Sequence, residues 1–241
     1  MSAAARRTLR IAHAHGNRRD QIDRANGADV DLIEADLWFR AGEIWVRHER
    51  RCRFLPLLYD GKPKGVERFG PWALTVFPGY YIKLDIEPIR LRELLARTSG
   101  KRRLLLDLKG DYNDAAAYAY AETLSTALTE AGARETAIVC GQTDSLDHVR
   151  EVAPDLDVRY SLEREEQWQA LKRRVEAKPG IPGVCIHWQF YQREGVAGFL
   201  ESNGMQAFCW TVDDLAEARK LVELGAAGII SNRLDVLAQL S

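Results

Sequence analysis

The chain has 241 residues, a length close to the roughly 250 residues of a single α/β barrel. Hydrophobic residues make up 46% of the chain and charged residues 29%, a composition that excludes disordered and collagen-like proteins. The 34 Lys and Arg nearly balance the 35 Asp and Glu, and the resulting net charge of −1 argues against a dedicated nucleic-acid-binding protein.

The first part of the chain predicts short strands. Residues 10–15 (RIAHAH) form a β-like run, and the polar stretch 17–26 can form a helix that ends at Gly27. Residues 31–39 (DLIEADLWF) predict a second strand, and residues 43–48 (EIWVRH) predict its hairpin partner. No GxGxxG or GxxxxGK[ST] motif follows the first strand, which weighs against nucleotide binding.

An insertion of about residues 50–86 then interrupts the pattern. Its segments LPLLYDGKPKG and FGPWALTVFPGYY are rich in Gly, Pro and aromatic residues. Inside a compact domain, a long segment of this kind is usually a functional lid or a binding loop. The alternative is that the insertion forms a plug that covers the barrel.

From residue 86 onward, helical patterns alternate regularly with apolar runs. The predicted strands are 103–109, 136–141, 157–162, 183–190, 206–212 and 228–231, and the predicted helices are 86–98, 115–131, 145–152, 163–177, 196–202, 213–224 and 234–240. Apolar strands without strict alternation are typical of a parallel sheet that helices cover on its faces. The eight strands, nearly all followed by a helix, predict a (β/α)8 TIM barrel that occupies residues 1–241 as a single domain, with the insertion after its second strand.

Three carboxylates are predicted at one rim of this barrel, where catalytic groups usually lie at the carboxyl ends of the strands. Glu34 and Asp36 stand two residues apart on the second strand, so both project to the same face. Asp107 and Lys109 end the third strand with the same spacing. Three converging carboxylates repel one another unless a cation lies between them, and oxygen ligands suit Mg²⁺ or Ca²⁺. We therefore predict a divalent metal site at Glu34, Asp36 and Asp107, although a Glu-x-Asp pair alone is a weak signal.

Two histidines are predicted near the same rim. His13 falls at the end of the first strand and His48 at the end of the hairpin partner. Two imidazoles that titrate near neutral pH can serve as a general acid and a general base, and together with a metal they suit phosphodiester cleavage. The alternatives are a hydrogen-bonded structural role for His13 and a solvated surface position for His48. We interpret His148 as a surface residue, whereas His187 could line the barrel.

In order along the chain, several segments resemble the glycerophosphodiester phosphodiesterase family. They are IAHAHGN, ADVDLIEADLWFRAGEIWVRHE, LLLDLKG and FCWTVDDLAEARKLVELGAAGIISNRLDVL, and they span about residues 10 to 237. The resemblance implies a TIM barrel with His13 and His48 as the catalytic pair and a metal on the three carboxylates. It further implies that Lys109 contacts the phosphate and that Trp210 helps to wall the substrate pocket.

The chain departs from the family pattern at several positions. Ala14 stands where the family has Arg, and GNRRDQ replaces the usual Pro-Glu-Asn-Thr stretch. Glu49 stands in place of Asp, and Asp107 in place of Glu. The Asp-Leu-Lys sequence at 107–109 also resembles the sphingomyelinase D branch of the superfamily. Candidates for replacing the charge of the missing Arg are Lys109, Arg47 and Arg40.

Three functions follow as hypotheses. The first is metal-dependent hydrolysis of glycerophosphodiesters to glycerol 3-phosphate and an alcohol. The second is phospholipase D-like cleavage of lysophospholipid headgroups, motivated by the insertion aromatics Trp72, Phe77, Tyr80 and Tyr81, which could contact lipid. The third is a barrel that binds a phosphorylated ligand without hydrolysing it. In the first two hypotheses the binding partner is a small-molecule phosphodiester or a lysophospholipid. None of the three hypotheses involves nucleic acid.

The N-terminal residues, the apolar runs and the cysteine spacing indicate where in the cell the protein resides. The first residues, MSAAARRTLRIAHAHG, contain no apolar stretch of the signal-peptide type, and no apolar run approaches the roughly 18 residues that cross a membrane. The four Cys show no CxxC spacing, and Cys140, Cys185 and Cys209 fall within apolar strand-like runs. We therefore expect a reduced, cytoplasmic protein without stable membrane insertion.

Overall fold

The structure is a computed structural model that describes residues 7–51, 58–61, 73–77, 80–83, 87, 89–177 and 180–240. Eight parallel strands in this part of the chain form a closed barrel. They are β1 (Leu9–Ala12), β2 (Leu32–Arg40), β9 (Arg103–Lys109), β10 (Ala137–Gly141), β11 (Asp157–Leu162), β12 (Gly183–His187), β13 (Gln206–Trp210) and β14 (Gly228–Ser231). Strand β1 closes the barrel because Ile11 pairs with Leu32 of β2 on one side and with Ile230 of β14 on the other. The predicted (β/α)8 TIM barrel is confirmed.

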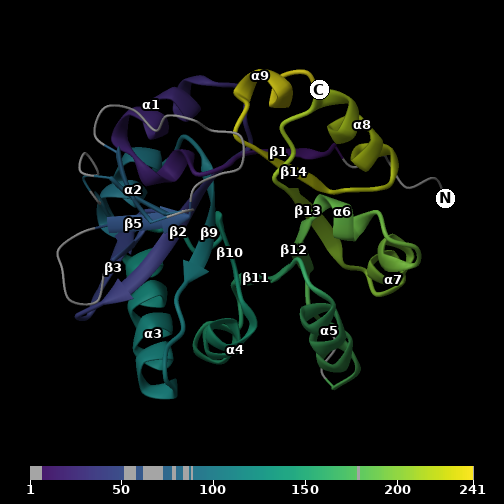
Figure 1. Cartoon of the computed structure of the whole chain (residues 1–241). Coiled ribbons are helices and arrows are strands. Elements are labelled where there is room, and N and C mark those ends of the chain that lie inside the picture. The colour runs from purple at the N-terminus through teal and green to yellow at the C-terminus, as the bar shows by residue number, and fades with distance from the viewer. Residues whose placement is uncertain are drawn as a thin grey trace.

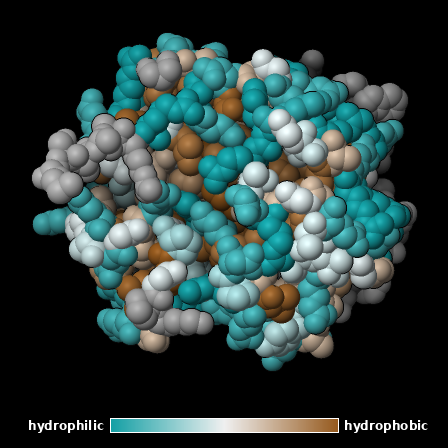
Figure 2. All heavy atoms as spheres, turned by 180° about the vertical axis from the view of Figure 1, so that it is seen from behind, coloured by the Kyte–Doolittle hydropathy of each residue, from teal (hydrophilic) through white to brown (hydrophobic). Residues whose placement is uncertain are grey.

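Helices surround the barrel (Figure 1). They are α1 (Arg19–Gly27), α2 (Leu91–Thr98), α3 (Asp114–Glu130), α4 (Thr143–Val152), α5 (Glu165–Ala177), α6 (Trp188–Tyr191), α7 (Val196–Ser202), α8 (Leu215–Glu223) and α9 (Leu234–Leu237). Each longer helix buries an apolar stripe; on α3, Tyr120, Leu124 and Leu128 are buried. Seen from behind, the outer surface is mostly hydrophilic, with smaller hydrophobic areas between (Figure 2). None of the described helices has the length and apolar content needed to cross a membrane.

Apolar side chains fill the interior of the barrel. The filling includes Ile11, Leu32, Leu105, Ile138, Cys140, Cys185, Phe208 and Ile230. At the amino ends of the strands, the Arg159 guanidinium lies 3.8 Å from the centre of the Phe208 ring and donates to Gln206 Oε1 at 2.9 Å. Cys140, Cys185 and Cys209 are buried as predicted, while Cys52 lies outside the described residues. A filled lumen leaves the carboxyl ends of the strands as the place for a site.

Strands β1 and β12 each end three residues earlier than predicted. Strand β1 stops at Ala12, because Ala14 takes the left-handed conformation with φ of 56° and a 3-10 turn, η1 (His15–Asn17), follows. This turn packs tightly on β2, since a Cβ on Gly16 would lie 2.4 Å from the Cβ of Ala35. The run predicted as strand 183–190 becomes a helix after His187, because short apolar runs suit buried helices and strands equally well.

The insertion contains a small sheet of its own. The hairpin strand β3 (Glu43–Val46) pairs with β2, and β8 (Ile89–Arg90) pairs with β3. Next to these, β4 (Arg50–Arg51), β5 (Leu58–Gly61), β7 (Tyr80–Lys83) and β6 (Ala73–Phe77) form a four-stranded antiparallel sheet in that order. Of the aromatics proposed to contact lipid, Trp72 lies outside the described residues, and Tyr80 is 50% exposed. A lid or plug role for the insertion stays a prediction.

The close approach of β12 and β13 predicts that a side chain at their contact would destabilise the fold. A Cβ on Gly183 would lie 2.2 Å from the carbonyl oxygen of Gln206, so Gly183→Ala forces the two strands apart. We expect a loss of about 1–3 kcal/mol in the free energy of unfolding, measured by urea denaturation. The matched control is Gly198→Ala in α7, where nothing lies within 4 Å of the added methyl and a gain of roughly 0.5–1 kcal/mol is expected. Equal stability of the two variants would contradict the prediction.

Candidate active site

The polar residues predicted at the strand ends meet in one cavity of about 650 Å³ at the carboxyl end of the barrel. Six of the predicted site residues line it, namely His13, Glu34, His48, Asp107, Lys109 and Trp210. Asp36 lies in the wall beneath them with 1% of its surface exposed. The structure therefore brings all seven predicted residues together, although they come from four separate stretches of the chain.

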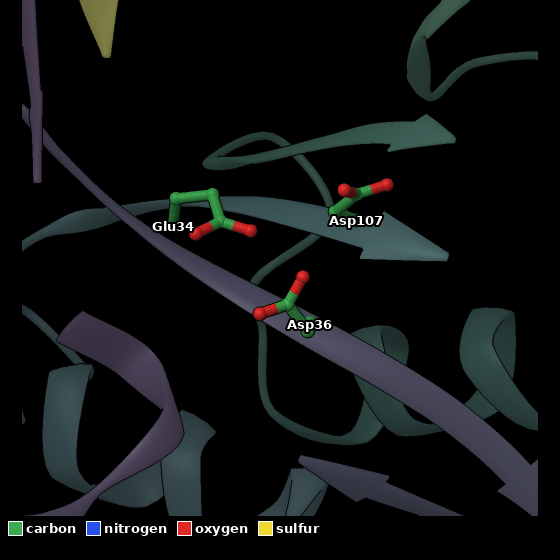
Figure 3. Close-up of side chains that lie close together, drawn as sticks. All are labelled: Glu34, Asp36 and Asp107. Carbon is green, nitrogen blue, oxygen red and sulfur yellow. The ribbon is translucent and has the colours of Figure 1, made fainter. Parts of the chain in front are cut away.

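The three carboxylates form a compact cluster (Figure 3). Parallel pairing of β2 with β9 places Asp36 directly beside Asp107, and Glu34 follows on the same face of β2. One oxygen from each of the three residues lies within 4.8 Å of the others. Glu34 is 3% exposed, so two of these three acids are almost completely buried.

Lys109 and Asn17 hold the cluster together. The Lys109 ammonium contacts the Asp107 carboxylate and lies 2.9 Å from Asp36 Oδ1. Asn17, in the turn after β1, donates from Nδ2 to Asp36 Oδ2 at 2.6 Å and accepts from the Asp36 backbone N–H at 2.9 Å. Sequence reasoning did not identify Asn17, because the η1 turn that carries it to Asp36 has no clear sequence signal.

The electrostatics of the cluster favour an added cation. Burial, together with the charges of Asp36 and Asp107, raises the pKa of Glu34 well above its ordinary value. Burial would also raise the pKa of Asp36, but the charges of Lys109 and His48 outweigh it and lower that pKa. Burial works to lower the pKa of Lys109, whereas the three carboxylates raise it well above the ordinary value. One ammonium thus faces three acids, and negative charge is left in excess.

This donor set fits a hard divalent cation. Mg²⁺ and Ca²⁺ bind oxygen ligands at about 2.0–2.6 Å, so two ligands of one ion can lie at most about 4–5 Å apart. The oxygens of Glu34, Asp36 and Asp107 satisfy that limit, and none of the three residues offers nitrogen or sulfur. The cluster could therefore hold such an ion.

A chain of hydrogen bonds orients His13. Its Nδ1 lies 2.8 Å from Asn232 Oδ1, and its Nε2 lies 4.0 Å from Glu34 Oε2. Asp213 accepts from Asn232 Nδ2 at 2.7 Å and from the Asn232 backbone N–H at 2.8 Å. A carboxylate accepts only, so Asp213 turns the amide oxygen of Asn232 toward His13, and neutral His13 carries its proton on Nδ1. Its Nε2 lone pair is then directed to the cavity.

Asp213 and Asn232 were not identified from the sequence, although a signal for them exists. Asp213 follows the carboxyl end of β13, and Asn232 follows that of β14. Functional groups of a barrel usually lie at these positions. Burial works to raise the pKa of Asp213, but hydrogen bonds from Asn232 and Ser231 lower it. The bond from Ser231 Oγ is 2.8 Å long and ties the end of β14 to the same carboxylate.

His48 stands where β3 leaves the barrel. The backbone N–H of Arg47 donates to the Asp36 carbonyl at 3.0 Å, which keeps this segment beside β2. His48 is exposed and lines the same cavity as His13. A second cavity of about 650 Å³, formed by the turn after β1 and the start of α1, also has both histidines in its wall. The His13–His48 pair therefore separates two adjoining spaces.

Of the remaining histidines, His15 lines the second cavity, whereas His148 and His187 line neither. His15 is buried with Nδ1 2.8 Å from the carbonyl oxygen of His13, and burial lowers its pKa. His148 packs its ring edge-on against Tyr118 at 4.4 Å and lines neither cavity. His187 packs against Trp210 with ring centres 5.2 Å apart, behind the cavity wall.

Comparison with known protein families decides the assignment. Residues 93–236, more than half of the chain, match the glycerophosphoryl diester phosphodiesterase family. The chain belongs to this family. It is accordingly a phosphodiesterase enzyme, and the family resemblance inferred from the sequence is confirmed. A comparison with curated proteins gave no match.

Solved structures share the fold of this glycerophosphoryl diester phosphodiesterase family member. A protein of Silicibacter pomeroyi DSS-3 assigned as such an enzyme has a TM-score of 0.75 and 20% identity, covering 97% of this chain and 92% of its own. The enzyme of Thermotoga maritima has a TM-score of 0.68 and 17% identity over 97% and 98% of the two chains. An Oleispira antarctica phosphodiesterase in complex with the product sn-glycerol-3-phosphate has a TM-score of 0.67 and 13% identity over 96% and 95%. At these identities the likeness concerns the fold.

The hydrogen-bond chain behind His13 makes a spectroscopic prediction. Replacing Asn232 by Leu removes the acceptor of the Nδ1 proton, so neutral His13 loses its preference for the Nδ1–H tautomer. Long-range ¹⁵N–¹H NMR correlation of the imidazole rings measures this directly. Asn203→Leu at the end of α7 is the control, since Asn203 bonds locally to the Phe199 carbonyl at 2.8 Å. An unchanged His13 tautomer in Asn232→Leu would rule out the proposed orientation.

Proposed function

We propose that this enzyme hydrolyses glycerophosphodiesters to glycerol 3-phosphate and an alcohol, with His13 and His48 as the acid–base pair. The observation that carries the proposal is the convergence of both histidines and the carboxylate cluster on one cavity at the carboxyl end of the barrel. The product complex of the structurally similar Oleispira antarctica phosphodiesterase supports this substrate class.

The carboxylates Glu34, Asp36 and Asp107 would hold Mg²⁺ or Ca²⁺. When bound, such an ion supplies positive charge that neutralises the phosphoryl oxygens. Lys109 keeps Asp36 and Asp107 in place, and its side chain is 29% exposed and lines the cavity, where it can serve as a phosphate contact. Trp210 forms part of the wall around the substrate.

The two histidines move the protons of the reaction. His13 presents an unprotonated Nε2 to the cavity because Asn232 engages its Nδ1 proton, so we assign His13 as the base that accepts a proton from water. The water oxygen forms the new bond to phosphorus, and the bond from phosphorus to the alcohol oxygen breaks. His48, which also lines the cavity, donates the proton that this departing oxygen takes up.

Removal of either imidazole tests the acid–base assignment. His13→Ala and His48→Ala should each lower kcat by roughly 10²–10⁴-fold, because proton transfer in the transition state loses its partner. Release of glycerol 3-phosphate from a water-soluble glycerophosphodiester is the measurement, and circular dichroism verifies folding. His148→Ala, outside both cavities, is the control and should keep full activity. Wild-type-like turnover in either single variant would contradict the assignment of His13 and His48 as the acid–base pair.

Metal dependence has a separate test. EDTA treatment should abolish turnover, and added Mg²⁺ or Ca²⁺ should restore it. Asp107→Asn keeps the shape of the side chain but removes one charge from the cluster, so calorimetric titration should show metal affinity at least about tenfold weaker. Asp111→Asn is the matched control, because Asp111 lines the same cavity outside the cluster. Equal loss in both variants would argue against a site at the three carboxylates.

A further inference from the structure

The carboxylate cluster and Lys109 do not provide a free positive charge for the phosphoryl group of the proposed substrate. A glycerophosphodiester brings a negatively charged phosphoryl group beside a cluster of carboxylates, and like charges at this distance repel. The ammonium of Lys109 is already engaged by Asp107 and lies 2.9 Å from Asp36, so its charge is largely neutralised before substrate arrives. A second protein cation on the cavity wall would offset the charge of the incoming phosphoryl group.

The arginines suggested by the sequence do not meet this requirement. The Arg47 side chain is buried, donates to the Glu49 carbonyl and lies 5.4 Å from the Trp38 ring. Arg40 ends β2 at the hairpin. Among the described residues that line the two cavities, neither Arg47 nor Arg40 is present. Arg18 and Arg19 line the second cavity, but each pairs with a carboxylate, Arg18 with Asp20 at 3.1 Å.

Arg50 has the properties that these residues lack. It follows His48 by two positions, lines the same cavity as His13, Asp107 and Lys109, and is exposed. Within the described part of the chain, no carboxylate forms an ion pair with Arg50. Among the described residues, its guanidinium is therefore an uncommitted positive charge at the cavity in which the phosphoryl group of the proposed substrate would lie.

We propose that Arg50 binds the non-bridging oxygens of the substrate phosphoryl group. The inference rests on the proposed phosphodiesterase site and adds to it a binding residue from the insertion. A guanidinium presents two parallel N–H donors, which match two oxygens of one phosphoryl group. The anchor is held by the small sheet, since Arg50 pairs with Tyr59 of β5. Substrate binding would therefore depend on the insertion as well as on the barrel.

The neighbouring residue provides a matched control. Arg51 lies on the same two-residue strand, carries the same charge, is also exposed and pairs with Leu58 of β5. Successive side chains of a strand point to opposite faces, and Arg51 lines neither cavity. Removing Arg51 lowers the net charge of the sheet by the same amount without touching the proposed contact.

The experiment compares Arg50→Gln, Arg50→Lys and Arg51→Gln with the unmodified protein in MgCl₂ and in EDTA. Two readouts are used: kcat and KM for a glycerophosphodiester, and calorimetric binding of glycerol 3-phosphate without turnover. We expect Arg50→Gln to lower kcat/KM by roughly 10–100-fold, mostly through KM, and to weaken glycerol 3-phosphate binding similarly. Arg50→Lys should recover part of the loss, and Arg51→Gln should stay within about twofold of the unmodified protein.

The outcomes separate this inference from the proposed function. If the unmodified protein hydrolyses the diester and Arg50→Gln matches it in both readouts, the Arg50 inference is overturned and the function stands. Equal losses in Arg50→Gln and Arg51→Gln also overturn it, because the effect is then one of general charge. If the unmodified protein binds glycerol 3-phosphate without hydrolysing diesters, the proposed function fails, and selective weakening by Arg50→Gln still supports the phosphate contact. Absence of both binding and hydrolysis overturns both.

Discussion

Mutual repulsion of three acids at the end of the barrel is the constraint around which this site is arranged. Burying charged carboxylates is costly unless each finds a partner, and Glu34 and Asp36 are almost completely buried. Their partners all come from nearby backbone or the same rim: the Ala14 N–H donates to Glu34, Asn17 donates to Asp36, and Lys109 bridges Asp36 and Asp107. Burial first, and then the charges of Asp36 and Asp107, raise the pKa of Glu34 despite these partners. Such an arrangement serves cation binding better than stability.

The short turn after β1 connects this cluster to the acid–base chemistry. Within five residues it supplies the imidazole of His13, the N–H of Ala14 and the amide of Asn17. Gly16 allows the turn to lie against β2, where any side chain would collide with Ala35. A change in the positions of the carboxylates would therefore also shift His13, because the same short turn holds both. Asp213 and Asn232 fix the other side of the ring, so His13 is oriented from two directions.

Local patterns in the sequence predicted the barrel and the carboxylates well. Glu34 and Asp36 are two residues apart on one strand, and the alternation of side chains alone puts them on one face. Asn17 and Asn232 were missed because loops carry them to their partners, and loop geometry depends on contacts between distant segments. The end of β12 was misplaced for a related reason: Phe190 and Tyr191 are buried in α6, and a short run with apolar residues suits a buried helix as well as a strand. From the sequence, Arg40 and Arg47 were candidates for replacing the charge of the missing Arg. The fold shows that neither side chain lines the cavity.

The insertion and the barrel divide the tasks of the proposed reaction. The proposed metal ligands and His13 belong to the barrel rim, whereas His48 lies where the chain leaves β3, and Arg50 lies on β4 of the inserted sheet. A rigid barrel can hold the carboxylates at fixed separations, which tight metal coordination requires. The leaving alcohol varies among glycerophosphodiesters, and its proposed proton donor and phosphate anchor lie on the segment that follows β3, outside the eight barrel strands. In the proposed reaction, the position of the small sheet relative to the rim would therefore affect how the phosphoryl group is held and how His48 reaches the departing oxygen. We therefore expect substrate choice to depend on the segment that follows His48 more than on the eight barrel strands.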